Sequence, residues 1–213
     1  MEKKKRASKV SKKLAHLFPD AKIALHYSSH LELLVSVILS AQCTDKKVNE
    51  VTLKLFNKYR SIEDYLRVHP EEFEEDIRST GFYRNKTKNI LLSTKIIKEK
   101  FGGKIPSTMN ELLSLPGVAR KTANIVLGNA FGKVEGIAVD THVKRLSRKL
   151  DLTNSGNPIV IERDLMKLFP RREWFTLTLR LIEYGRTICP ARKHVCENHP
   201  LSLIYPPAAS RWP

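Results

Sequence analysis

The spacing of apolar side chains constrains this fold most, because it follows a helical period along nearly the whole chain. In the first strongly apolar segment, such residues recur at i, i+3, i+4, i+7 and i+8, which places them on one helix face. They are Leu31, Leu34, Val35, Ile38 and Leu39. The same spacing returns near residues 48–56 and 90–97. Alternating apolar and polar runs bounded by hairpin turns, which indicate strands, do not occur. The sequence therefore predicts an all-α fold.

Proline and glycine divide this pattern into roughly ten helical segments. The breaks fall at Pro70, Gly81, Gly102, Gly103, Pro106, Pro116, Gly117, Gly132, Gly136, 156–158 and Pro170. The last helix is expected from about Glu173 to Thr187, with irregular chain beyond Cys189. Residues 1 to about 12 are rich in Lys and Ser, and we expect a mobile tail there.

Charge indicates a polyanionic partner. The chain of 213 residues holds 38 Lys and Arg against 22 Asp and Glu, a formal net charge of +16. Such an excess does not help the fold, since like charges repel one another in the compact state. Nucleic acid is the first interpretation and an anionic membrane the second, while a merely solvated basic surface stays open. Charge alone does not separate DNA from RNA.

Cysteine count and hydropathy predict a soluble protein of the cytoplasm. Three cysteines do not suggest a disulfide scaffold, and no apolar core of signal-peptide length follows the basic start. The longest apolar stretch, Leu33 to Leu39, is too short to cross a bilayer. We therefore expect no membrane association and an intracellular protein, nucleoid-associated if DNA is the polyanion that it binds.

The segment LLSLPGVARKTANIVLGNAF, residues 112–131, predicts two short helices joined by a tight turn. The free N–H groups and the dipole at the start of the second helix favour an anion. Gly117 lacks a Cβ, so a phosphate can approach closely, and Arg120 adds positive charge. The expected DNA-binding residues of this hairpin are Pro116, Gly117, Val118, Ala119 and Arg120. The alternative is an ordinary capped corner between helices.

Lys121 follows Arg120 in the first turn of that second helix. A free lysine has a pKa of about 10.4, so at neutral pH almost none is an amine nucleophile. A helix N-terminus, the neighbouring Arg120 and partial desolvation would lower that pKa. The alternative role is a phosphate contact by a surface lysine.

Asp140 stands directly before the apolar-periodic helix that contains Val143 and Leu146, and so predicts an N-cap. A carboxylate fixed in this way could also face the Lys121 amine, accept a proton, or stabilise positive charge on a deoxyribose. His142, two residues later, is either a first-turn residue or a DNA contact.

LPGVARKTANIV followed by VDTHVKRL resembles the helix-hairpin-helix/Gly-Pro-Asp superfamily of DNA glycosylases, and within it the endonuclease III family. The resemblance extends to LLVSVILSAQCTDKKVN (33–49), TGFYRNKTKNI (80–90) and LIEYGRTIC (181–189). Together these motifs cover nearly the whole chain, from about residue 20 to 205.

The resemblance implies roles for single residues. Lys121 takes the position of the catalytic lysine and Asp140 that of the catalytic aspartate. Gln42 matches the glutamine that fills the gap left by a flipped nucleotide. Phe82 stands where the family has a wedge residue, commonly leucine.

The implied fold has two all-α lobes with the active site in the cleft between them. One lobe would comprise residues 1–22 and 135–213. The other, 23–134, would have six helices and carry the helix-hairpin-helix at about 112–131.

The resemblance implies base excision from damaged double-stranded DNA with abasic-site lyase chemistry, and a preference for oxidised pyrimidines, which the family favours. Lys121 would attack C1′ of an extruded nucleotide, and the resulting Schiff base would permit β-elimination. Alternatives are a relative acting on another lesion, a non-catalytic DNA-binding module and, more remotely, an RNA-associated protein. Nothing demands more than a monomer.

The C-terminal region departs from the family, which usually ends in C-x6-C-x2-C-x5-C around a 4Fe–4S cluster. Cys189 and Cys196 keep their positions, but His199 and Tyr205 occupy the other two. Because a cubane cluster normally needs four thiolates, we expect no conventional cluster and no metal cofactor. Zinc at Cys189, Cys196 and His199 would lack a fourth ligand, so two unpaired thiols are preferred.

Two smaller expectations concern packing. Without a cluster, apolar residues would hold the C-terminal loop, namely Leu201, Leu203, Ile204, Tyr205 and Trp212. Ala119 replaces a glycine common in relatives, and we expect the hairpin to tolerate it. Cys43 is expected in the core.

Overall fold

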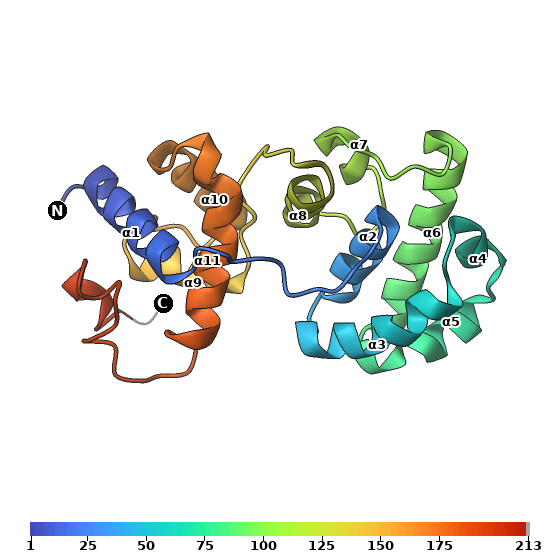
Figure 1. Cartoon of the computed structure of the whole chain (residues 1–213), viewed down its shortest axis with the longest axis horizontal. Helices are drawn as coiled ribbons and strands as arrows, with labels where there is room; N and C mark the ends of the chain where they lie inside the picture. The colour runs from blue at the N-terminus through green and yellow to red at the C-terminus, as the bar shows by residue number, and fades with distance from the viewer. Residues whose placement is uncertain (212–213) are drawn as a thin grey trace. The chain divides into compact units, whose positions relative to one another are not determined.

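The computed structural model describes residues 1–211, in which every regular element is an α-helix or a short 3-10 helix (Figure 1). The predicted all-α fold is confirmed. The chain divides into two compact units, one formed by Met1–Ile23 and Val134–Pro213 and the other by Ala24–Lys133. No helix among the described residues has the length and apolar composition needed to cross a bilayer. Trp212, expected in the C-terminal packing, lies outside the described residues.

The unit 24–133 is built around α2, which the first apolar segment forms. Its elements are α2 (His30–Leu39), α3 (Asp45–Lys58), α4 (Ile62–Arg67), α5 (Pro70–Ile77), η1 (Arg78–Thr80), α6 (Tyr83–Phe101), α7 (Met109–Leu113) and α8 (Arg120–Phe131). Residues 33–39 are buried throughout, and α2 packs against α3, α6 and α8. Ser29 caps α2 by accepting a hydrogen bond from the N–H of Glu32.

The unit formed by the two chain ends has α11 at its centre. Its elements are α1 (Lys3–Leu17), α9 (Thr141–Lys149), α10 (Pro158–Leu168), η2 (Arg171–Glu173), α11 (Trp174–Thr187) and η3 (Pro206–Ala208). The helix α11 packs against α1 and α9, and α10 packs against α1 and α9. Leu146, Leu165 and Leu181 are fully or almost fully buried where these helices meet.

The prediction of a mobile N-terminal tail is wrong, because α1 begins at Lys3. Ala7, Val10 and Leu14 are completely buried, and their i, i+3, i+7 spacing gives the helix one apolar stripe among many lysines. Arg6 is also buried; its guanidinium contacts the Asp151 carboxylate at 3.1 Å. Burial of this apolar stripe therefore orders α1, although the lysine-rich composition of the segment suggests a solvated tail.

The chain after α11 is irregular, as predicted, but it is anchored at several points. Leu201 is buried, and Ile204 and Tyr205 pack against the same core. Leu203 is 68% exposed, so its predicted packing role is wrong. Cys189 and Cys196 are both buried in this region.

Candidate functional site

The predicted hairpin is present, with α7 and α8 joined by residues 114–119. Ser93 of α6 donates its hydroxyl hydrogen bond to the carbonyl oxygen of Pro116 at 2.9 Å and so fixes the turn. The N-cap of α8 is Ala119, whose methyl group makes no side-chain cap hydrogen bond. The first-turn N–H groups of α8 therefore have no side-chain oxygen at the cap, which leaves them available for a phosphate.

Gly117 is needed for a reason that the sequence did not reveal. Its φ of +76° lies in the left-handed region, and an added Cβ would come within 2.9 Å of the Asn89 side chain. Gly117 is thus required for the close packing of α6 against the turn, in addition to the predicted approach of a phosphate. Ala119 has a φ of −87°, which any residue adopts, so its methyl group causes no backbone strain at this position.

Lys121 is the second residue of α8, and its side chain is exposed. The predicted partial desolvation of Lys121 by the protein is therefore not found. Lys121 belongs to the unit 24–133, whereas Asp140 belongs to the other unit.

Asp140 is the N-cap of α9, as predicted, and its Oδ1 accepts a hydrogen bond from the N–H of Val143 at 2.8 Å. This bond fixes the half-buried carboxylate at the helix start. His142, in the first turn of α9, lies against Gly185 of α11, where any Cβ would overlap the imidazole ring. The histidine is thus a packed first-turn residue. The sequence did not reveal that Gly185 makes room for its ring.

Gln42 and Phe82 share an uncommon backbone conformation. Their φ angles are +52° and +50°, in the left-handed region that non-glycine residues seldom adopt. Both side chains are exposed, and that of Phe82 is 64% exposed. A large apolar ring held out in solvent by a strained backbone is typical of a binding surface.

A buried lysine secures the turn before Phe82. Lys86 donates a hydrogen bond from Nζ to the carbonyl oxygen of Thr80 at 2.8 Å. Burial lowers the pKa of Lys86, and proximity to Cys43 opposes this only in part. Cys43 itself is half-buried rather than in the core, contrary to expectation.

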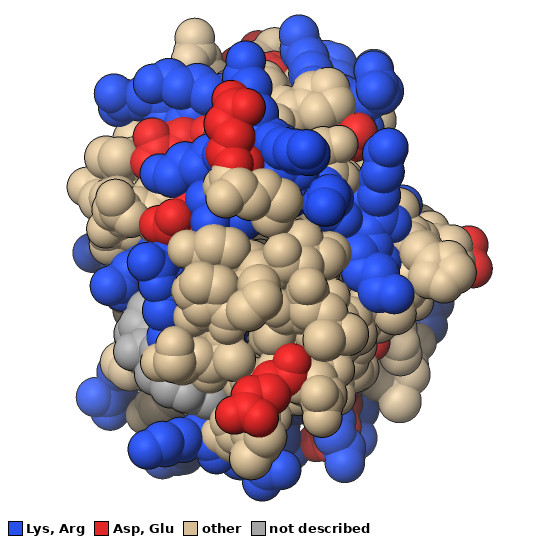
Figure 2. Space-filling view, turned by 90° about the vertical axis from the view of Figure 1, so that its left-hand side faces the viewer, with Lys and Arg blue, Asp and Glu red and all other residues tan. Residues whose placement is uncertain are grey.

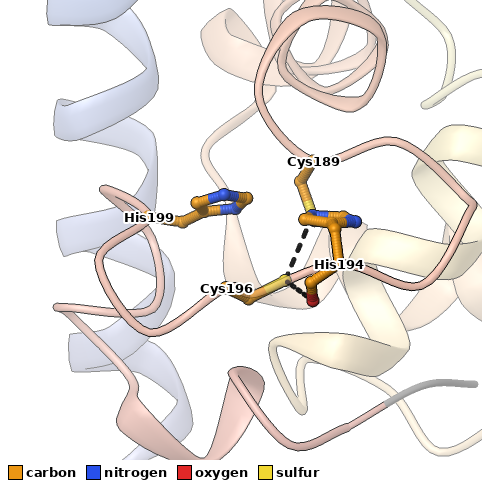
Figure 3. A group of neighbouring side chains, drawn as sticks. All are labelled: Cys189, His194, Cys196 and His199. Atoms are coloured by element: carbon orange, nitrogen blue, oxygen red, sulfur yellow. Dashed lines mark hydrogen bonds between the residues drawn. The ribbon is translucent and has the colours of Figure 1, made fainter.

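A second group of chemistry-bearing side chains lies in the chain after α11. Cys189, His194, Cys196 and His199 bring one donor atom each within 4.8 Å of one another (Figure 3). Burial raises the pKa of the Cys189 thiol, while a hydrogen bond from Arg145 opposes the shift. Burial is also the main cause of the lowered pKa of His199. His194 is the member that the sequence analysis missed.

The residues present do not fit a 4Fe–4S cluster. Only two thiols are available, and Tyr205, at the fourth family position, directs its hydroxyl to Asp151 at 3.4 Å. The guanidinium of Arg6 also covers the Tyr205 ring at 4.0 Å. Moreover, a cubane holds its ligands on four separate iron atoms, which sets the donor atoms farther apart than ligands of a single ion.

Basic side chains are spread widely rather than confined to the hairpin. On the face shown in Figure 2, Lys and Arg cover more of the surface than Asp and Glu, and they lie around a central area of other residues. This distribution agrees with the net charge of +16 and with electrostatic attraction to a polyanion over a broad surface.

Comparisons with known proteins agree with the motifs. Residues 35–171 match the family described as "HhH-GPD superfamily base excision DNA repair protein". Endonuclease III of Synechocystis sp. is 50% identical over 206 residues, covering 97% of this chain and 94% of that protein. Endonuclease III of Bacillus subtilis is 47% identical over 190 residues, covering 89% and 86%.

Two solved structures resemble this one closely. "Structure of a non-covalent Endonuclease III-DNA Complex" has a TM-score of 0.94 and 43% identity, covering 99% of both chains. "Structure of a Trapped Endonuclease III-DNA Covalent Intermediate: Estranged-Adenine Complex" has a TM-score of 0.91 and 44% identity, covering 96% of both. These matches confirm the predicted glycosylase fold.

Proposed function

Because the chain belongs to the endonuclease III family of the HhH-GPD superfamily of base excision DNA repair proteins, we propose that it is a DNA glycosylase with abasic-site lyase activity. The observation that carries the proposal is Lys121, an exposed amine in the uncapped first turn of α8. A relative 44% identical to this chain forms a trapped covalent intermediate with DNA, which requires a protein nucleophile.

The nucleophilic step begins when the Lys121 amine forms a bond to C1′ of an extruded nucleotide. The glycosidic bond breaks, and the base leaves with the bonding electrons and takes up a proton. The sugar ring opens to a protonated Schiff base, which acidifies C2′. Loss of a C2′ proton and cleavage of the C3′–O bond then release the 3′ phosphate. Water finally hydrolyses the Schiff base and frees Lys121.

Asp140 is the carboxylate of this mechanism. Its Oδ1 is engaged by the N–H of Val143, so the carboxylate keeps one orientation during the reaction. It serves by accepting a proton from the Lys121 ammonium and by stabilising positive charge on the deoxyribose. Because Lys121 is exposed in the protein alone, its desolvation comes from the DNA that covers it.

The exposed residues of the unit 24–133 supply the DNA contacts. The first turn of α8 and Arg120 bind a phosphodiester without reading sequence. Gln42 fills the gap left by the extruded nucleotide, and the Phe82 ring enters the base stack as a wedge. Both side chains are exposed at residues with positive φ angles, which supports these roles.

The partner proposed is damaged double-stranded DNA, bound by a monomer. Oxidised pyrimidines are the proposed lesions, on the resemblance to endonuclease III. His142 packs against Gly185 but is only half-buried, and the exposed part of its ring is proposed to contact DNA from the start of α9. A relative acting on a different lesion remains the neighbouring alternative, which a panel of lesion duplexes decides.

Borohydride trapping tests the proposal. Wild-type protein incubated with a thymine glycol duplex should give a covalent adduct on reduction of the Schiff base. Lys121→Ala should lose the adduct and keep duplex binding, and Asp140→Asn should slow base removal by about a hundredfold or more. Lys100→Ala and Asp20→Asn, at exposed positions outside the proposed site, are the matched controls.

Two results would refute the proposal. Wild-type protein that binds the duplex but never traps would favour a non-catalytic binding module. Undiminished trapping by Lys121→Ala would assign the nucleophile to another residue. Binding should also weaken steeply with salt, because phosphate contacts release counterions.

A further inference from the structure

The chain between α11 and η3 folds back so that four soft-metal ligands meet. Cys189 and Cys196 are buried, whereas His194 and His199 are half-buried at the same point. His194 is the fourth ligand. The family spacing does not predict it, because it lies between the two cysteines in sequence rather than at a cluster position. Figure 3 shows the four side chains converging from successive stretches of one loop.

The distances suit a single tetrahedral ion. For Zn–S of about 2.3 Å and Zn–N of about 2.0 Å, neighbouring ligand atoms of a tetrahedron lie about 3.5 Å apart. The Sγ of Cys196 lies 3.2 Å from Nε2 of His194, and all four donor atoms lie within 4.8 Å of one another. A cluster that places thiolates and imidazoles on different iron atoms would need a wider arrangement.

The imidazole of His194 is oriented for binding. Its Nδ1 lies 2.6 Å from the carbonyl oxygen of Arg192, which can only accept, so Nδ1 carries the proton. Nε2 then presents its lone pair to the centre of the group. Hydrogen bonding of the second ring nitrogen to a carbonyl is the usual support of a metal-bound histidine. His199 has a buried Nδ1 without a hydrogen-bond partner among the described residues.

Two basic side chains of α9 stabilise the sulfur atoms. Lys149 donates from Nζ to Sγ of Cys196 at 3.4 Å, and Arg145 donates to Sγ of Cys189 at 3.7 Å. Arg145 also bonds the carbonyl oxygen of Cys189 at 2.6 Å. These contacts fix the positions of the two sulfur atoms beside α9, and a metal ion that binds them would release the thiol protons.

From these contacts we propose that Cys189, His194, Cys196 and His199 bind one Zn²⁺ ion. Four protein ligands close the coordination shell, so the ion is structural and takes no part in the reaction. It holds the loop 189–199 in place of the cluster that the family usually carries there. The proposal stands apart from the glycosylase activity, because it concerns metal content and loop stability.

Elemental analysis of the purified full-length chain, produced with iron and zinc both supplied, tests this proposal. We expect about one zinc per chain, no acid-labile sulfide and no absorption band near 400 nm. Replacing zinc by Co²⁺ should give visible absorption typical of a tetrahedral thiolate site. His194→Ala and Cys196→Ser should weaken zinc affinity by at least about tenfold, the lower bound for loss of an outer-shell partner.

Cys43→Ser and His69→Ala are matched controls, since both residues lie in the unit 24–133, and both should keep the full zinc content. Should Cys196→Ser fail to fold, chelation of the wild type decides. Removing zinc should lower the Tm, and zinc added back should restore it. Metal content is measured without DNA, so failure of the trapping experiment leaves this result standing.

Four outcomes would overturn the proposal. Iron with stoichiometric sulfide would show a cluster held by fewer thiolates than usual. A Cys189–Cys196 disulfide in freshly purified protein, or protein that takes up no zinc when supplied with it, would show that no ion binds. Full zinc binding by His194→Ala would remove the ligand on which the inference depends.

Discussion

Replacing Gly117 by alanine tests how the turn before α8 is built. The substitution adds a methyl group at a φ of +76°, and the left-handed region costs an L-residue about 1–2 kcal/mol. The new Cβ would also lie 2.9, 3.0 and 3.1 Å from Nδ2, Cβ and Cγ of Asn89. Rotating the amide cannot relieve this, because the Asn89 Cβ is itself too close.

Crowding of this kind costs about 1–3 kcal/mol in a packed region. Added to the backbone cost, it predicts a loss of about 2–5 kcal/mol in the unfolding free energy of Gly117→Ala. Gly132→Ala is the matched control: its φ is +63°, and its Cβ would meet nothing within 4 Å. The control should lose only the backbone part, about 1–2 kcal/mol.

Urea unfolding of Gly117→Ala, Gly132→Ala, Asn89→Ala and the double variant Gly117→Ala/Asn89→Ala separates the backbone cost from the contact cost. In the double variant the contacts with Nδ2 and Cγ of Asn89 disappear, while the contact with its Cβ and the backbone cost remain, so Asn89→Ala should partly rescue Gly117→Ala. Borohydride trapping should fall in Gly117→Ala, because α6 and the hairpin separate near the Ser93–Pro116 hydrogen bond. Equal losses in the Gly117 and Gly132 variants, or no rescue by Asn89→Ala, would refute the reasoning.

Three further substitutions probe separate parts of the chain. Ala119→Ser should cap α8, raise the unfolding free energy by about 1 kcal/mol and weaken duplex binding, because the new hydroxyl competes with phosphate for the same N–H groups; unchanged binding in a titration would contradict this. In the wild type, the unfolded state binds the Lys86 proton more tightly, so stability should rise with pH from the lowered pKa towards about 10.4, and Lys86→Met should abolish that rise in unfolding curves. Lys86→Met should also reduce trapping, since Nζ no longer holds the Thr80 carbonyl. Arg6→Ala should lower the Tm by removing the buried partner of Asp151, with a loss of about 1.5 kcal/mol because Arg211 still pairs with this carboxylate; a change under about 0.5 kcal/mol would indicate that α1 needs no such anchor.

Local features of the site were predictable from sequence, because the chemistry that defines them lies within a few residues. Asp140 precedes an apolar-periodic helix, and its cap to Val143 follows from that position alone. Pro116 and Gly117 interrupt the helical pattern, which locates the hairpin turn. The all-α fold follows in the same way from a spacing repeated along the chain.

Contacts between distant segments could not be predicted from one sequence. The Cβ-free surface of Gly185 matters only because α11 brings it against His142. The order of α1 depends on burying Ala7 against helices more than a hundred residues away, and its lysine-rich composition concealed the stripe. The exposure of Lys121 likewise follows from the packing of α8 rather than from its sequence neighbours.

The four candidate metal ligands after α11 were partly predictable from local sequence and partly dependent on the fold of the loop. The family spacing places His199 and Tyr205 at the two missing cluster positions. In the structure, the fold of the loop brings His194 close to the two cysteines, and the Tyr205 hydroxyl contacts Asp151 instead. Glycosidic cleavage, Schiff base formation and β-elimination each move electron pairs and need no electron donor or acceptor. Zn²⁺ has no redox chemistry, so an ion at this loop contributes by holding the chain in place. The two proposals are therefore chemically compatible, and a zinc-free variant that still traps DNA would separate loop support from catalysis.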